Sequence, residues 1–152
     1  MRYRNLLYIL CVSVFIAGFS SCSVSARIKR ADKKYNIGEY YQAAEMYKQV
    51  YRRINSKDKS MRAHVAFNQG ECYRILNNSK ATSAYKNAIR YHYPDSIVYL
   101  HYAQVLHYQG KYKEAEDDLD EAIAHINKYN TNNKFKCIIF YKMYSIIKNY
   151  TF

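Results

Sequence analysis

Gly38-Glu-Tyr-Tyr-Gln-Ala-Ala44, in the first third of the chain, returns in the last third as Gly110-Lys-Tyr-Lys-Glu-Ala115. The two glycines are 110 − 38 = 72 residues apart, which is about two helical-hairpin repeats of roughly 34 residues plus a small adjustment. Glycine at the end of a helix adopts the left-handed conformation that reverses the chain. The repeated motif therefore predicts stacked helical hairpins, which usually form binding surfaces rather than active sites.

The residues that follow each glycine support this interpretation. Tyr40 and Tyr112 stand two positions after the glycines, where an apolar side chain packs under the turn. Ala43 and Ala115 stand five positions after them, and their small side chains allow two antiparallel helices to approach closely. We expect the tight crossing of each hairpin at these alanines.

The repeat divides most of the chain into three hairpins, at about 24 to 57, 63 to 95 and 96 to 129. Each hairpin needs a small residue in its first helix, a large residue in its second helix, and a position where it touches the next hairpin. The expected small residues are Ala31, Gly70 and Ala103. The expected large residues are Tyr47, Tyr85 and Leu119, and the expected contacts between repeats are Val50, Ala88 and Ala122.

The middle hairpin has no glycine at its turn, which falls within residues 76–81. Asparagine tolerates a positive φ better than most residues, so Asn77 or Asn78 is expected to replace the glycine. Pro94 comes just after the second helix of this hairpin, and proline cannot continue a helix.

Together these positions resemble the tetratricopeptide repeat (TPR) family over residues 24 to 129. The resemblance implies an all-α fold, a right-handed α-solenoid of about three TPR helical hairpins. The alternative is a bundle of three to six helices with chance similarities. With only 4 glycines and 1 proline, and long segments of good helix formers, the composition makes strands unfavourable under either interpretation.

The amino terminus has the order of regions that a secretory signal needs. Arg2 and Arg4 precede an apolar run from Leu6 to Phe19, and Ser20-Ser21-Cys22 follows. The run is shorter than the roughly 20 residues of a transmembrane helix. We therefore expect residues 1–21 to be a signal peptide of the lipoprotein type and residues 22–129 to be the TPR domain.

The small residues before Cys22 resemble a lipobox, in which the cysteine thiol becomes lipidated and the signal is removed. Ser23 follows the cysteine, and this resemblance implies an outer membrane lipoprotein that faces the periplasm. The alternative is ordinary cleavage after Val24-Ser25-Ala26, which would leave a soluble periplasmic product.

Charge is strongly positive, with a formal net charge of +12 that falls to +10 when Arg2 and Arg4 leave with the signal. Such a balance would suggest nucleic acid in the cytosol, but an exported protein meets little of it, so no nucleic-acid partner is expected. The basic residues between Arg27 and Lys34 either contact anionic head groups or form a solvated helix face.

Signatures of enzymes and metal sites are missing from the sequence. The five histidines are not spaced with cysteines or carboxylates in a zinc pattern, and there is no glycine-rich phosphate loop. His101 and His107 are expected on a helix surface. Cys72 is expected to be buried as a small apolar residue, although a disulfide with Cys137 is also conceivable in an oxidising compartment. We expect no enzyme activity, no cofactor, no metal and no small-molecule substrate.

The TPR resemblance implies a concave groove, lined by the first helix of each repeat, that holds extended peptides or partner helices. Aromatic residues would supply buried area there, and Arg74 would pair with a carboxylate of the partner. Alternatively, Phe67, Leu100 and Tyr108 complete the core. The groove positions of this register, expected to bind a partner, are Asp32, Tyr35, Phe67, Glu71, Arg74, Leu100, Gln104, His107 and Tyr108.

Residues 130–152 do not fit the repeat. Their apolar residues recur at helical spacing and alternate with lysines, which is typical of a helix that caps a solenoid. The abrupt change to Lys, Asn, Ile, Tyr and Phe also fits a non-native tail from a truncated gene.

A narrower resemblance rests on the lipobox-like start, the segment Ala31 to Ala44, Gly70-Glu-Cys-Tyr-Arg74 and Tyr93-Pro94-Asp95. These segments look like the repeat domain that begins some OmpA-family lipoproteins linked to type IX secretion in Gram-negative bacteria. This resemblance implies a lipid-anchored scaffold or adaptor that binds other envelope proteins. The alternatives are a remnant of a longer OmpA-like envelope protein without independent activity, or a soluble periplasmic chaperone.

Overall fold

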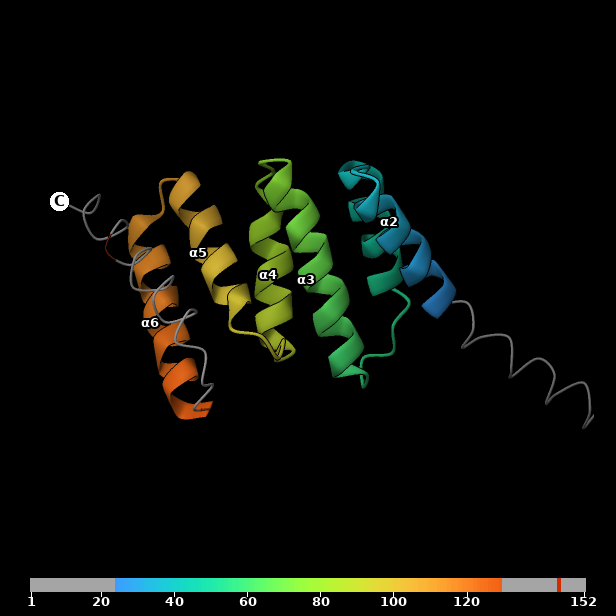
Figure 1. Ribbon diagram of the computed structural model, residues 1–152. Coiled ribbons are helices and arrows are strands. Elements are labelled where there is room, and N and C mark those ends of the chain that lie inside the picture. Colours follow the sequence, from blue (N-terminus) through green and yellow to red (C-terminus); the bar gives the residue numbers. More distant parts are fainter. Residues whose placement is uncertain (1–23, 130–144, 146–152) are drawn as a thin grey trace, which may run out of the picture.

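The computed structural model describes residues 24–129 and Ser145, and every regular element in that part of the chain is an α-helix. The first helix covers residues 24–36 of the described chain. It is followed by α2 (Tyr40–Tyr51), α3 (Lys59–Ile75), α4 (Lys80–Arg90), α5 (Ile97–Tyr108) and α6 (Tyr112–Tyr129). These helices form three antiparallel hairpins that stand in one row (Figure 1). The predicted all-α solenoid of three helical hairpins is confirmed.

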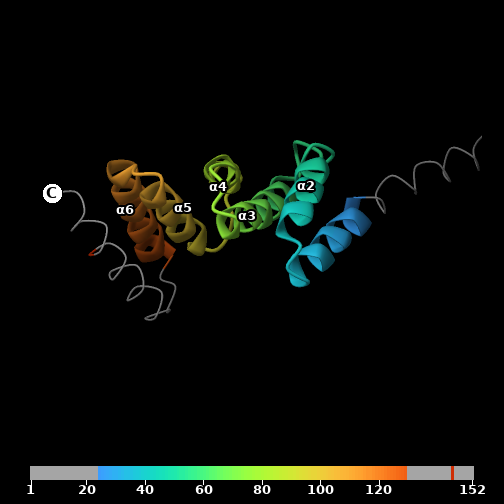
Figure 2. The same cartoon turned by 90° about the horizontal axis from the view of Figure 1, so that it is seen from above.

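Packing between helices distinguishes the solenoid from a closed bundle. Each pair of consecutive helices from α2 to α6 is in contact, and α3 also touches α5. A view from above shows an elongated row with the first and third hairpins at opposite ends (Figure 2). The contact between α3 and α5 brings together the first helices of the second and third hairpins, which positions the site described below.

The three hairpin turns share one backbone geometry. Gly38 and Gly110 have φ values of +82° and +74°, and Asn77 has a φ of +50°. In each turn the N–H of this residue donates to a carbonyl three residues earlier, and the next N–H donates to a carbonyl five residues earlier, at 2.8 to 3.0 Å. This is the pattern that ends helices through a left-handed residue. The prediction that an asparagine replaces the middle glycine is confirmed, and the residue is Asn77.

A fourth turn of the same kind, which the sequence analysis did not predict, ends α4. His92 has a φ of +58°, its N–H donates to Ile89 at 2.9 Å, and the N–H of Tyr93 donates to Ala88 at 3.0 Å. Pro94 follows immediately, as expected for a residue beyond a helix end.

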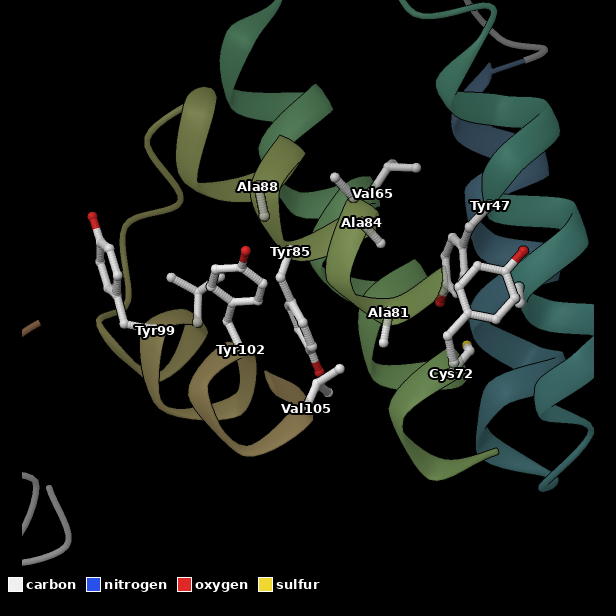
Figure 3. Packing of buried hydrophobic residues seen from close by; sticks show 14 of the residues in the cluster. Tyr47, Val65, Cys72, Ala81, Ala84, Tyr85, Ala88, Tyr99, Tyr102 and Val105 are labelled. Atoms are coloured by element: carbon white, nitrogen blue, oxygen red, sulfur yellow. The ribbon is translucent and has the colours of Figure 1, made fainter. Parts of the chain in front are cut away.

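The core contains the positions predicted from the repeat. Tyr47, Tyr85 and Leu119 are buried, as are the small residues Ala31, Gly70 and Ala103. Ala43, Ala115, Val50 and Ala88 are also buried. The side chain of Ala122 lies outside the described part of the structure. Figure 3 shows the ring of Tyr85 entering the space between α4 and α5, beside Tyr102 and Val105.

One expectation about the boundaries needs correction. The second hairpin begins at Lys59 instead of about 63, because the Asp58 carboxylate accepts a hydrogen bond from the Met61 N–H at 3.0 Å and caps α3. Tyr112 packs at its turn as Tyr40 does, because it meets the ring of His107 edge to face at 5.1 Å between centroids and Tyr40 meets Tyr35 in the same way at 5.4 Å. Tyr112 is 37% exposed.

Several expectations concern residues outside the described ranges. They are the signal peptide at 1–21, lipidation at Cys22, the disulfide partner Cys137, and the C-terminal helix or tail at 130–152. Within the described ranges, no helix combines the length and the hydrophobicity that a membrane span requires.

Candidate functional site

Two neighbouring hollows lie along the first helices of the three hairpins. The carboxylate hollow has a volume of about 420 Å³ and the turn hollow about 520 Å³. Residues from helix 24–36, α2, α3 and α5 line the carboxylate hollow, namely Asp32, Tyr35, Asn36, Tyr47, Phe67, Asn68, Glu71 and His101. Residues from α3, α5 and the middle turn line the turn hollow, namely Arg74, Asn77, Asn78, Ser79, Val105, Tyr108 and Gln109.

Glu71 is the most heavily bonded residue of the site. Its side chain lies between three helices, and the residue is only 7% exposed. Tyr85 Oη donates to Glu71 Oε1 at 2.5 Å, His101 Nδ1 lies 2.5 Å from the same oxygen, and an Arg74 Nη donates to Oε2 at 2.6 Å. Burial alone would raise the pKa of this carboxyl, but hydrogen bonds from His101, Arg74 and Tyr85 bring the pKa down to about 2. Glu71 is therefore a carboxylate at neutral pH, with its charge satisfied inside the chain.

Arg74 joins the two hollows. It is bonded to Glu71 on one side and lines the turn hollow on the other. Although burial lowers the pKa of a guanidinium, the bond to Glu71 raises the pKa of Arg74 above its ordinary value. The carboxylate that Arg74 pairs with in this structure thus belongs to its own chain.

Asp32 supplies a second carboxylate to the carboxylate hollow. Tyr47 Oη donates to Asp32 Oδ1 at 2.6 Å. Burial and this hydrogen bond raise the pKa of the Tyr47 phenol, so it remains a donor. Among the described residues, no lysine or arginine forms an ion pair with Asp32.

Aromatic rings form the apolar wall of the same hollow. The ring of Phe67 stacks on Tyr93 at 4.2 Å between centroids and lies nearly parallel to His101 at 6.2 Å. Tyr35 meets Tyr40 edge to face at 5.4 Å. These contacts with neighbouring rings hold Phe67 and Tyr35 in place and form the wall of the hollow.

The edge of the turn hollow consists mainly of an aromatic ring and amide side chains, with one charged group. Tyr108, at 79% exposure, presents nearly its whole ring to solvent beside Asn77 and Asn78. Gln109 exchanges hydrogen bonds with Thr82 at 2.9 and 3.3 Å, which ties the end of α5 to α4. The hollow therefore offers one aromatic ring, several amides and the guanidinium of Arg74.

Most residues expected in the groove line one hollow or the other. Asp32, Tyr35, Phe67 and Glu71 line the carboxylate hollow, and Arg74 and Tyr108 line the turn hollow. Leu100 follows the alternative interpretation, because it is 3% exposed and belongs to the core. The remaining two expected residues, Gln104 and His107, are half-buried and line neither hollow.

Sequence reasoning missed Asn68 and His101. Both stand two positions before the small residue of their helix, Gly70 and Ala103, so they occupy equivalent places in consecutive repeats. Contrary to the expectation of a position on a helix surface, the His101 side chain is only 19% exposed and is bonded to Glu71. The equivalence of the two positions was the signal that could have identified them.

Metal binding finds no support in the part of the chain that the structure describes. No group of three or more His, Cys, Asp or Glu side chains there is arranged to hold a metal ion. Cys72 is buried in the core, as expected, and burial raises the pKa of its thiol to about 12.

Comparison with known proteins identifies a fold but no family. No protein-family model matches the chain, and no curated protein matches it either. One similar solved structure is the Yersinia enterocolitica type III secretion chaperone SycD in complex with a peptide of the translocator YopD. The TM-score is 0.69 at 18% sequence identity, over 86% of this chain and 95% of that chain. At this identity the likeness concerns the helical-repeat fold alone.

Proposed function

We propose that this chain is a non-enzymatic adaptor that holds an extended segment of a partner protein along the carboxylate hollow and the turn hollow. The observation that carries the proposal is the pair of hollows itself. They follow one another along the first helices of the hairpins, and both combine aromatic rings with fixed polar groups. Such a lining gives an extended peptide apolar area and orienting hydrogen bonds.

The similar structure supports the same class of function. SycD is a chaperone, and its structure contains a peptide of a translocator. A helical-repeat protein of this shape thus holds a segment of another protein. By analogy of fold, we infer a protein or peptide ligand here, and no nucleic acid or small-molecule substrate.

A pull-down tests the groove. The full chain would be crosslinked to its partners in cells, and the recovered proteins would be compared with those captured by Tyr35→Ala and Tyr108→Ala variants. We expect both variants to lose the same partners. Tyr41→Ala is a matched control, because Tyr41 is 65% exposed and lines neither hollow. If a verified partner binds the two groove variants as well as it binds the control, the groove is not the binding site.

We further propose that the adaptor is anchored by a lipid on Cys22 in the outer membrane, faces the periplasm, and serves an envelope assembly such as type IX secretion. The support is the order of basic, apolar and small residues before Cys22. Mass spectrometry of the mature amino terminus would find acyl chains on Cys22. An unmodified start near Arg27 would instead indicate a soluble periplasmic chaperone.

A remnant of a longer OmpA-like protein is the second candidate, favoured by the change of composition after residue 129. Sequencing the DNA that follows the gene separates the two. Coding sequence for further envelope domains in another frame would support the remnant.

A further inference from the structure

We propose that the carboxylate hollow receives a lysine or arginine side chain of the bound partner segment. The cationic head would lie at Asp32, and the aliphatic stem would lie along Phe67 and Tyr35. This inference rests on the proposed function and names the chemistry of the partner at one place in the groove.

The carboxylate hollow is negatively charged, whereas the protein as a whole is positively charged. The whole sequence has 24 lysines and arginines against 12 acidic residues. The lining of the carboxylate hollow nevertheless contains two carboxylates and neither a lysine nor an arginine. A negatively charged hollow in a positively charged protein indicates that the hollow binds a positively charged group of the ligand.

The two carboxylates are not equivalent. Glu71 is saturated by Tyr85, His101 and Arg74, so its charge is offset inside the chain. Asp32 accepts one hydrogen bond from the neutral phenol of Tyr47 and has no ion pair within the described ranges. Asp32 is thus the carboxylate that a ligand cation would meet.

Neighbouring cations are directed elsewhere. Lys34, two residues after Asp32, forms an ion pair with Glu39 at 2.6 Å. Arg74, on α3, is bonded to Glu71 and faces the turn hollow. His101 is the other titratable base at the carboxylate hollow, and its Nδ1 is bonded to Glu71. A cation from the partner therefore has no rival for Asp32 among these groups.

The walls suit a long basic side chain. Lysine and arginine bury their aliphatic stems on apolar surfaces while the charged head reaches a polar group. Rings such as Phe67 and Tyr35 also attract a cation over their faces. The volume of about 420 Å³ lies within the range of roughly 300 to 1,000 Å³ typical of ligand sites. An acidic side chain would be repelled by the carboxylate of Asp32, which has no compensating cation within residues 24–129.

A peptide selection tests the inference with the full chain and a phage-displayed library of random decapeptides. We expect the selected peptides to share a lysine or arginine at one position, against the general repulsion of basic peptides by a chain of net charge +12. Asp32→Asn should lower the affinity for the best synthetic peptide by about tenfold or more, since hydrogen bonds to charged groups are worth about 1.5 to 3 kcal/mol. The amide oxygen of Asn still accepts from Tyr47, which preserves the fold.

Replacing the basic residue of that peptide by norleucine should lower its affinity by a similar factor. The norleucine peptide and the Asp32→Asn variant together should bind little more weakly than either change alone makes them bind. Asp117→Asn on α6 changes the net charge equally outside the hollow and should leave affinity unchanged. If peptides are selected without a shared basic residue, or if they bind Asp32→Asn normally, this inference is wrong while the groove remains. If no peptide is selected at all, the proposed function fails and this inference fails with it.

Discussion

The phenol of Tyr85 donates a 2.5 Å hydrogen bond to Glu71 Oε1, so the residue that fills the core of the second hairpin also holds a carboxylate of the site. Tyr85 is fully buried and belongs to α4, whereas Glu71 belongs to α3. Tyr85, the large residue that packs the inside of its hairpin, thus also orients Glu71 in the site. This bond is one of three that keep Glu71 charged, so it links the stability of the hairpin to the charge state of the site.

Tyr85→Phe should lower the free energy of unfolding by about 1 to 3 kcal/mol, the usual cost of removing a partner from a buried polar group. Urea unfolding followed by circular dichroism measures it. Tyr102→Phe is the matched control, because Tyr102 is also buried and no hydrogen bond of its hydroxyl is seen within the described residues. Equal losses in the two variants would contradict a special role for the bond to Glu71.

Gly70→Ala should destabilise the chain although alanine favours helices. A Cβ at Gly70 would lie 2.7 Å from Tyr85 Cε1, so the buried ring must move. Overpacking costs about 1 to 3 kcal/mol, which exceeds the helix-propensity gain of about 1 kcal/mol. Urea unfolding tests the sign. A more stable Gly70→Ala variant would show that the ring can shift freely.

The effect of substitutions at the turns on stability should depend on the backbone conformation of the replaced residue. Gly110 has a φ of +74° and a Cβ there would meet nothing within 4 Å, so Gly110→Ala should lose about 1 kcal/mol through backbone strain alone. Gly110→Asn should recover most of that loss, because Asn77 holds the same conformation in the middle turn. Thermal unfolding compares the two variants. An Asn variant no more stable than the Ala variant would contradict the equivalence of the turns.

Acid should unfold the protein partly through Glu71. Its pKa falls from the ordinary 4.5 to about 2 in the folded chain. A lowered carboxyl pKa stabilises the fold above pH 4.5, and that stabilisation is lost as the pH falls toward 2. Stability measured in urea from pH 6 to pH 2.5 should decline less steeply in Glu71→Gln than in the parent. Glu116→Gln, outside this network, should keep the parent slope, and a parental slope in Glu71→Gln would refute the assignment.

The ionisation of Asp118 should change stability with pH in the direction opposite to that of Glu71. Burial, and next the charge of Glu121, raise its pKa from 3.8 to about 6. A raised carboxyl pKa favours the fold while the group is protonated, and this advantage is lost as the pH rises from about 4 to about 6. Asp118→Asn should therefore unfold at higher urea than the parent at pH 7 but not at pH 3.5. Asp120→Asn, at an exposed position of the same helix, serves as the control, and a pH-independent gain in Asp118→Asn would contradict the prediction.

Local sequence was sufficient to locate the three hairpin turns and the repeat positions of the core, but not the turn at His92. Gly38 and Gly110 marked reversals because few residues adopt a positive φ, and Asn77 is the next most tolerant residue at the equivalent place. The buried small and large residues followed from fixed spacing within one hairpin. The misplaced start of α3 was also a local matter, since Asp58 is a typical helix cap.

The site was predicted less completely, because it depends on how one hairpin is rotated against the next. Phe67 and Glu71 were placed in the groove from the register of one helix, but the same register proposed Leu100, which is buried in the core. On α5, His101 lines the hollow and Leu100 does not.

The sequence by itself determined three hairpins, their turns and the side chains that pack inside each, because backbone preference and helical spacing act over a few residues. Only the tertiary structure decided that Glu71, Tyr85 and His101 meet. These residues come from α3, α4 and α5, and Glu71 is 14 residues from Tyr85 and 30 residues from His101. The contact of Glu71 with Tyr85 depends on how α3 crosses α4 within one hairpin, and the contact with His101 depends on how that hairpin packs against the next. Many side chains set these packing angles together, and no single motif encodes them.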